Sequence, residues 1–145
     1  MDLWTAARST KKHLKRFLDE NEGINLDELD DHGYTALHYA CKSNSKPVVQ
    51  YLLSESASPN IPSNNEDKLD AIHIASEMGD VELVYSLIYF NANVNSTNGK
   101  LETPLHRAAM FGNRQVASLL IASNANIEAP DFEGRIQRHI NFSKF

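Results

Sequence analysis

Apolar residues along the chain recur with the spacing of short helices that come in pairs. In the stretch TPLHRAAMFGN, residues 103–113, the side chains of Leu105, Ala108 and Ala109 fall on one side of a helix. The segment VASLLI, which starts at Val116, repeats this spacing after a short break. The pattern predicts two short helices separated by a tight turn.

The same order of segments occurs three times. TALHYACKSNS begins at Thr35, DAIHIASEMGD at Asp70 and TPLHRAAMFGN at Thr103, so the starts are 35 and 33 residues apart. A second apolar segment follows each of them, and then a small polar stretch: SASPN, NANVN and NANIE. A period of this length is typical of stacked helical repeats.

The beginning and end of the first helix in each unit follow from residue chemistry. Thr103 can cap the helix with its hydroxyl group, and Pro104 suits the first helical position because its missing N–H would be unpaired there. Gly112 and Gly79 stand where the turn between the helices needs a positive φ, and Asn44 replaces them in the first unit. The predicted unit is helix, turn, helix, loop.

These segments resemble ankyrin repeats, whose signature is T-P-L-H-x-A. The resemblance implies an all-α solenoid of helix–turn–helix units linked by β-hairpin-like loops. It also implies one domain over residues 1–145, divided into an N-terminal capping repeat (1–29), three repeats (30–64, 65–97 and 98–130) and a partial C-terminal repeat or cap (131–145).

The two ends match the repeat less well. LWTAARSTKKHLKRFLDENEGIN fits with Trp4 in place of the histidine, and we expect its basic residues, Lys11, Lys12, Lys15 and Arg16, to form a solvated outer face rather than a nucleic-acid site. At the other end we expect Ile136, Ile140 and Phe142 to cover the third repeat, or else this segment frays.

The connections between units differ in length. Ten residues separate the two ends of segments 25–35 and 60–70, against eight for segment 95–103. The two additional residues predict a longer or bulged hairpin in the first two connections.

Composition narrows the classes of partner. A net charge of -5 gives no general attraction to nucleic acid or anionic membranes, and no apolar run approaches the ~20 residues of a membrane span. Cys41 is the single cysteine, which excludes an intrachain disulfide and indicates a reducing compartment. We therefore expect a cytoplasmic or nuclear monomer.

The three histidines in phase, His38, His73 and His106, raise the question of a metal site. Stacked helices lie ~8–10 Å apart, whereas zinc ligands lie within ~4 Å of one another, so shared ligation is excluded. The resemblance implies instead that each ring bonds to a helix cap or to backbone in the next unit. Asp70 with His73 has no nucleophile nearby in the sequence, and we expect Cys41 to be a buried, inert thiol. No catalytic, cofactor or metal site is expected.

The resemblance places partner binding on the concave surface formed by hairpin tips and first-helix ends. The expected protein-binding residues are Asp31, His32, Tyr34, Lys42, Glu66, Asp67, Leu69, Glu77, Met78, Lys100, Glu102, Met110 and Phe111. Their apolar members would form a strip flanked by acidic groups, which favours a partner segment with apolar anchors and basic residues. The alternative is that they are the isolated apolar residues that any protein surface carries. Tyr39, Ile74 and Arg107 are expected to be half buried and to contribute less.

The function that this implies is a non-catalytic protein–protein interaction module, acting as an adaptor, an inhibitor or an assembly factor. The alternative is a part of a larger protein whose repeats recruit substrate to an attached enzyme or domain.

Overall fold

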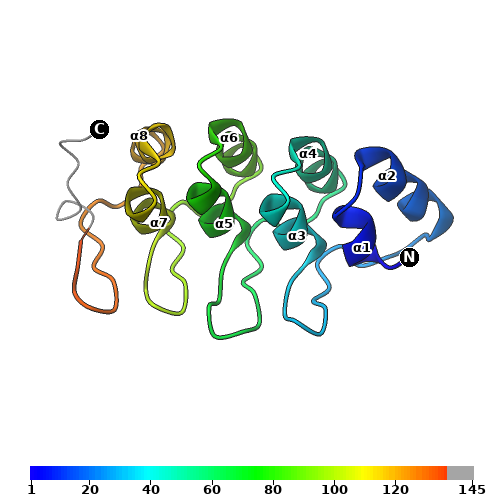
Figure 1. Ribbon diagram of the computed structural model, residues 1–145, viewed down its shortest axis with the longest axis horizontal. Helices are drawn as coiled ribbons and strands as arrows, with labels where there is room; N and C mark the ends of the chain where they lie inside the picture. The colour runs from blue at the N-terminus through cyan, green and yellow to red at the C-terminus, as the bar shows by residue number, and fades with distance from the viewer. Residues whose placement is uncertain (137–145) are drawn as a thin grey trace.

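The computed structural model describes residues 1–136, in which eight helices stack in a row of pairs (Figure 1). They are α1 (Leu3–Ala7), α2 (Lys11–Glu20), α3 (Ala36–Lys42), α4 (Lys46–Ser54), α5 (Ala71–Met78), α6 (Val81–Tyr89), α7 (Pro104–Met110) and α8 (Arg114–Ala122). The prediction of an all-α solenoid with paired helices is confirmed.

The pairs form two layers of helices, with the hairpin loops projecting on one side (Figure 1). The inner helices α1, α3, α5 and α7 pack against one another in order, and so do the outer helices α2, α4, α6 and α8. The largest fully buried side chains are Leu14, Leu37, Leu52, Ile72, Leu83, Leu87, Leu105, Leu120, His38, His73 and His106. Because each buried leucine contributes ~1.5–3 kcal/mol, this shared core is the main stabilising term.

The inner helices α3, α5 and α7 begin after the cap residues that the sequence predicts. The Thr103 hydroxyl accepts a hydrogen bond from the backbone N–H of His106 at 3.4 Å, and Thr103 N–H donates to Nδ1 of the same ring at 3.0 Å. In the turns that follow the inner helices, Asn44, Gly79 and Gly112 have φ values of 50°, 79° and 70°. The predicted cap and turn residues are therefore confirmed.

The hairpins differ in a way that the sequence resolves only in part. A backbone hydrogen bond of 2.8–3.0 Å closes each of the segments 30–34, 63–69 and 98–102. The two additional residues of the second connection lengthen its hairpin, as predicted. The first hairpin has the same length as the third, so the prediction of a longer first hairpin is wrong. Its extra residues lie in the segment 26–29 before the tip.

Neighbouring hairpin tips are joined through their backbones. Asn64 N–H donates to the carbonyl oxygen of Gly33, and Gly99 N–H donates to that of Asp67, both at 2.8 Å. A Cβ atom at Gly99 would lie 2.2 Å from the carbonyl oxygen of Glu66. This tip-to-tip contact therefore requires glycine at position 99.

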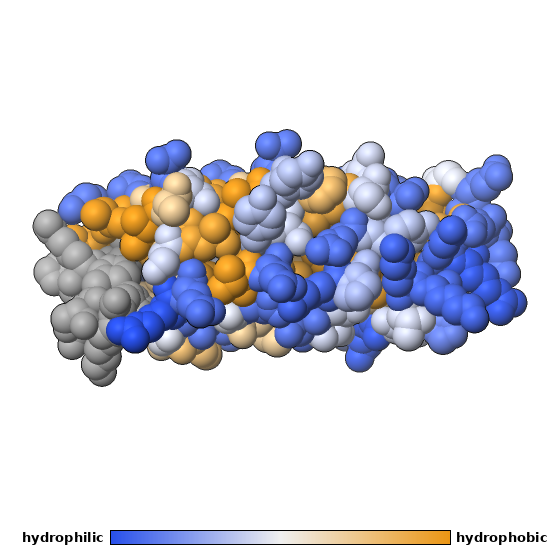
Figure 2. Space-filling view, turned by 90° about the horizontal axis from the view of Figure 1, so that it is seen from above, coloured by the Kyte–Doolittle hydropathy of each residue, from blue (hydrophilic) through white to orange (hydrophobic). Residues whose placement is uncertain are grey.

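The N-terminal pair is hydrophilic on its outer side. Trp4 stands in the histidine position and its Nε1–H donates to the carbonyl oxygen of Glu28 at 3.3 Å. The basic residues of α2, Lys11, Lys12, Lys15 and Arg16, are exposed. Figure 2 shows the outer layer as strongly hydrophilic at this end and more hydrophobic over α6 and α8.

The C-terminal segment begins a further hairpin. Asp131 N–H donates to the carbonyl oxygen of Arg135 at 2.8 Å, and Pro130 pairs with Ile136 in an isolated antiparallel bridge. This hairpin adjoins the third repeat. Ile140 and Phe142, which are expected to cover that repeat, lie outside the described residues.

Candidate protein-binding surface

The three histidines join neighbouring repeats. Each Nδ1 atom accepts a hydrogen bond from the backbone N–H of the residue that precedes its helix, so Nε2 carries the proton and donates. The Nε2 atoms of His38, His73 and His106 lie 2.6, 3.0 and 3.1 Å from the carbonyl oxygens of Leu69, Glu102 and Arg135. Both ring nitrogens are therefore used by the scaffold.

The environment of His38 and of His73 favours the neutral form of the ring. Burial lowers the pKa of His38 and of His73 below the ordinary value of 6.5. In residues 1–136 no group of three or more His, Cys, Asp or Glu side chains is arranged to hold a metal ion.

Two other side chains of types that often take part in catalysis are held within the scaffold. Burial raises the pKa of the Cys41 thiol to about 12, so it stays protonated and unreactive at neutral pH. The Asp70 carboxylate accepts a hydrogen bond from the hydroxyl group of Ser96 at 2.5 Å, and Asp70 N–H donates to His73.

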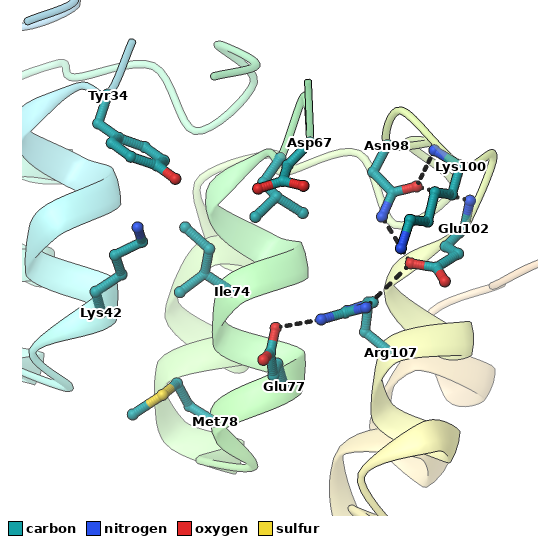
Figure 3. A pocket seen from close by; sticks show the side chains of 11 residues that line it. Tyr34, Lys42, Asp67, Ile74, Glu77, Met78, Asn98, Lys100, Glu102 and Arg107 are labelled. Carbon is teal, nitrogen blue, oxygen red and sulfur yellow. Dashed lines mark hydrogen bonds and ion pairs between the residues drawn. The ribbon is translucent and has the colours of Figure 1, made fainter. Parts of the chain in front are cut away.

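A groove of about 360 Å³ lies between the inner helices and the hairpins of the central repeats (Figure 3). Eight residues of the predicted surface line it: Tyr34, Lys42, Asp67, Leu69, Glu77, Met78, Lys100 and Glu102. A second hollow, lined in part by Met110 and Phe132, continues it toward the C-terminal hairpin. Asp31 and His32 line a separate hollow beside α1. Glu66 is exposed at a hairpin tip.

Three of the predicted apolar residues are half exposed at the ends of α5 and α7. The exposed fractions are 46% for Met78, 47% for Met110 and 49% for Phe111. We call these three residues the apolar strip. Tyr34 and Leu69 are partly buried, and Leu69 packs against the core, so they offer less surface than the sequence predicts.

Arg107 lines the groove and also contacts Phe111 of the apolar strip. Its guanidinium group lies 2.6 Å from Glu77 and 3.1 Å from Glu102, and its central carbon lies 5.2 Å from the centre of the Phe111 ring. The side chain is 17% exposed, so it is more buried than expected. Its smaller share in partner binding stays a prediction, but within the chain it connects two repeats and contacts Phe111. Ile74, which is also expected to be half buried, is buried, with an exposed fraction of 4%.

The prediction that Glu102 is an accessible tip residue is wrong. Its exposed fraction is 3%, because its carboxylate turns inward to Arg107 and to the Asn98 side-chain amide at 2.8 Å. These partners offset the cost of removing the charge from water. Glu77 also pairs with Arg107, so two of the predicted acidic groups are paired within the chain.

Two sequence models of ankyrin repeats match the chain, one of three copies over residues 3–65 and one of many copies over residues 72–121. The chain belongs to the ankyrin-repeat family. Ankyrin repeats are generally protein–protein interaction modules. Neither matched model describes anything but repeats.

Individual relatives of this ankyrin-repeat chain are diverse. It is 34% identical to an ankyrin repeat protein of Acanthamoeba polyphaga mimivirus, over 84% of this chain and 17% of that protein. It is 32% identical to the palmitoyltransferase AKR1 of Debaryomyces hansenii, over 73% of this chain and 14% of the enzyme. The B-cell lymphoma 3 protein homolog of Mus musculus is also 32% identical, over 77% of this chain and 25% of that protein. The chain therefore spans a quarter or less of these relatives. Within residues 1–136 the helices are too short to cross a membrane.

Proposed function

We propose that this chain is a non-catalytic interaction module that binds a partner protein along the groove and the apolar strip. The observation that carries the proposal is the half exposure of Met78, Met110 and Phe111 at matching helix ends of adjacent repeats. Solvent-exposed methionine and phenylalanine side chains are not required by the fold, and such residues are enriched at the centres of protein interfaces.

The partner segment would present apolar anchors to the apolar strip and basic residues to the hairpin tips. Asp31, Glu66 and Asp67 are exposed on these tips, and no cation among the described residues pairs with them. A monomer with such a surface would serve as an adaptor, an inhibitor or an assembly factor.

A second candidate is recruitment of substrate to an attached enzyme or domain. It is supported by the small share of a relative that the chain spans, 14% in the case of the palmitoyltransferase. Size-exclusion chromatography and urea unfolding of residues 1–145 separate the candidates, because a monomer that unfolds cooperatively supports an independent module.

Affinity capture followed by mass spectrometry tests the binding surface. The variant Met110→Ala/Phe111→Ala should lose the partner with unchanged helix content. The matched control is Tyr85→Ala/Tyr89→Ala, which removes two exposed aromatic rings from the outer helix α6, where the exposed fractions are 58% and 70%. Equal capture by both variants would place the site elsewhere.

A further inference from the structure

The charged side chains that line the groove differ in whether they are already paired. Their formal charges cancel: Lys42, Lys100 and Arg107 oppose Asp67, Glu77 and Glu102. Overall charge therefore does not select the partner. The partner is selected by the charged side chains that have no ion pair in the described part of the chain.

Arg107 removes most of the negative charge from the groove. It pairs with both Glu77 and Glu102, and the Glu102 side chain is 4% exposed in that pair. Neither carboxylate is then free for a cation of the partner. Asp67 is the one carboxylate of the groove lining without an ion pair among the described residues, and it stands on a hairpin tip.

Within residues 1–136, Lys42 is a cation without a counter-ion. Its Nζ atom lies 3.6 Å from the centre of the Tyr34 ring, and the described residues place no carboxylate within ion-pairing distance of Lys42 or of Lys100. A cation–π contact fixes the ammonium group but leaves its net charge, because the ring is neutral.

Lys42 lies beside aromatic and apolar side chains of the groove. Figure 3 shows Lys42 and Tyr34 on α3 and its hairpin, facing Ile74 and Met78 on α5. Lys42 is exposed, so an incoming carboxylate can reach its ammonium group while a neighbouring side chain of the partner packs on the apolar and aromatic surface beside it.

We infer that the groove binds an acidic side chain of the partner segment, with the carboxylate at Lys42 and an adjacent apolar side chain at Met78. This inference rests on the proposed function and deepens it. The partner then carries an aspartate or glutamate inside the groove, apolar anchors toward Phe111, and basic residues only toward the hairpin tips.

Panning a phage-displayed library of random 12-residue peptides against the full chain tests the inference. The expected pool has Asp or Glu next to Leu, Met or Phe. Synthetic peptides from this pool should bind Lys42→Glu at least about fivefold more weakly, which is the scale of one partly exposed ion pair. Panning on Lys42→Glu itself should select Lys or Arg at the same peptide position.

The control Lys12→Glu makes the same charge change on the exposed outer face of α2, and it should leave peptide affinity unchanged. Peptides that lose affinity for Met110→Ala/Phe111→Ala but show no acidic preference, or bind Lys42→Glu equally well, would overturn the inference and leave the proposed function standing. Failure to select any peptide, or peptides that are indifferent to Met110→Ala/Phe111→Ala, would overturn both. Thermal unfolding followed by circular dichroism checks that each variant folds.

Discussion

The Nε2 atom of His73 donates a hydrogen bond to the carbonyl oxygen of Glu102, 29 residues later, at 3.0 Å. The other ring nitrogen accepts from the backbone N–H of Asp70 at 3.1 Å. One imidazole therefore joins the start of a helix to the hairpin of the following repeat, and it satisfies two backbone groups that are shielded from water.

Replacing this ring should destabilise the fold. His73→Leu preserves approximate volume but leaves Asp70 N–H and the Glu102 carbonyl group unpaired, so the free energy of unfolding should fall by about 2–4 kcal/mol. Urea unfolding measures this loss. His32→Ala, at a side chain that is 78% exposed, should change the value by less than about 0.5 kcal/mol. Equal effects of the two variants would show that the buried bonds do not matter.

Stability should fall in mildly acidic solution. The pKa of His38 and of His73 is lowered in the folded state, so the unfolded chain binds protons first as pH falls through 6.5. Their contribution is complete above about pH 6.5 and is lost progressively below it. Urea unfolding at pH 7.5 and pH 5.5 should show the decrease, and His73→Leu should reduce it. A free energy of unfolding that is constant over this range would contradict the prediction.

Gly99→Ala should separate two hairpin tips. Its Cβ atom would lie 2.2 Å from the backbone oxygen of Glu66, which cannot rotate away, so the hairpin must move at a cost of about 1–3 kcal/mol. Denaturant unfolding measures the cost, and amide hydrogen exchange at Asn64, which donates to the Gly33 carbonyl oxygen, reports whether the neighbouring tip contact persists. The nearby exposed substitution Lys100→Ala is the control, and a loss as large as that of Gly99→Ala would argue against a steric cause.

Removing the Arg107 side chain should leave a buried charge without its cation. Arg107→Met should lower the free energy of unfolding by about 2 kcal/mol, because Glu102 remains enclosed. Adding Glu102→Gln should recover part of this loss, since a neutral amide needs no cation and can still accept from Asn98. The double-mutant cycle measures the coupling, and complete additivity would refute it.

The sequence predicts contacts that recur in each unit better than contacts made once. A helix start is predicted from Thr103, Pro104 and His106, because the capping hydrogen bonds join residues only three positions apart. The structure confirms this start. Arg107 follows that motif directly, yet its importance depends on Glu77, which lies 30 residues away in another repeat. A lone basic residue after the histidine is the signal that could have found it.

Burial at the hairpin ends could not be inferred from position alone. The register places Glu102 at a tip, where side chains are usually solvated, and nothing local shows that its carboxylate turns toward Asn98 and Arg107. The extra residues of the first connection could equally lengthen the hairpin or precede it. Only the pairing of Asp30 with Tyr34 decides between these arrangements.

The histidine bonds and the tip-to-tip bonds each connect a repeat only with its immediate neighbour. A displacement in the first repeat therefore reaches α7 through the repeats that lie between them, as force passes along springs connected in series. Small changes of angle at each junction between repeats add up along the row. The binding of a segment that spans several repeats would therefore depend on the curvature of the whole row.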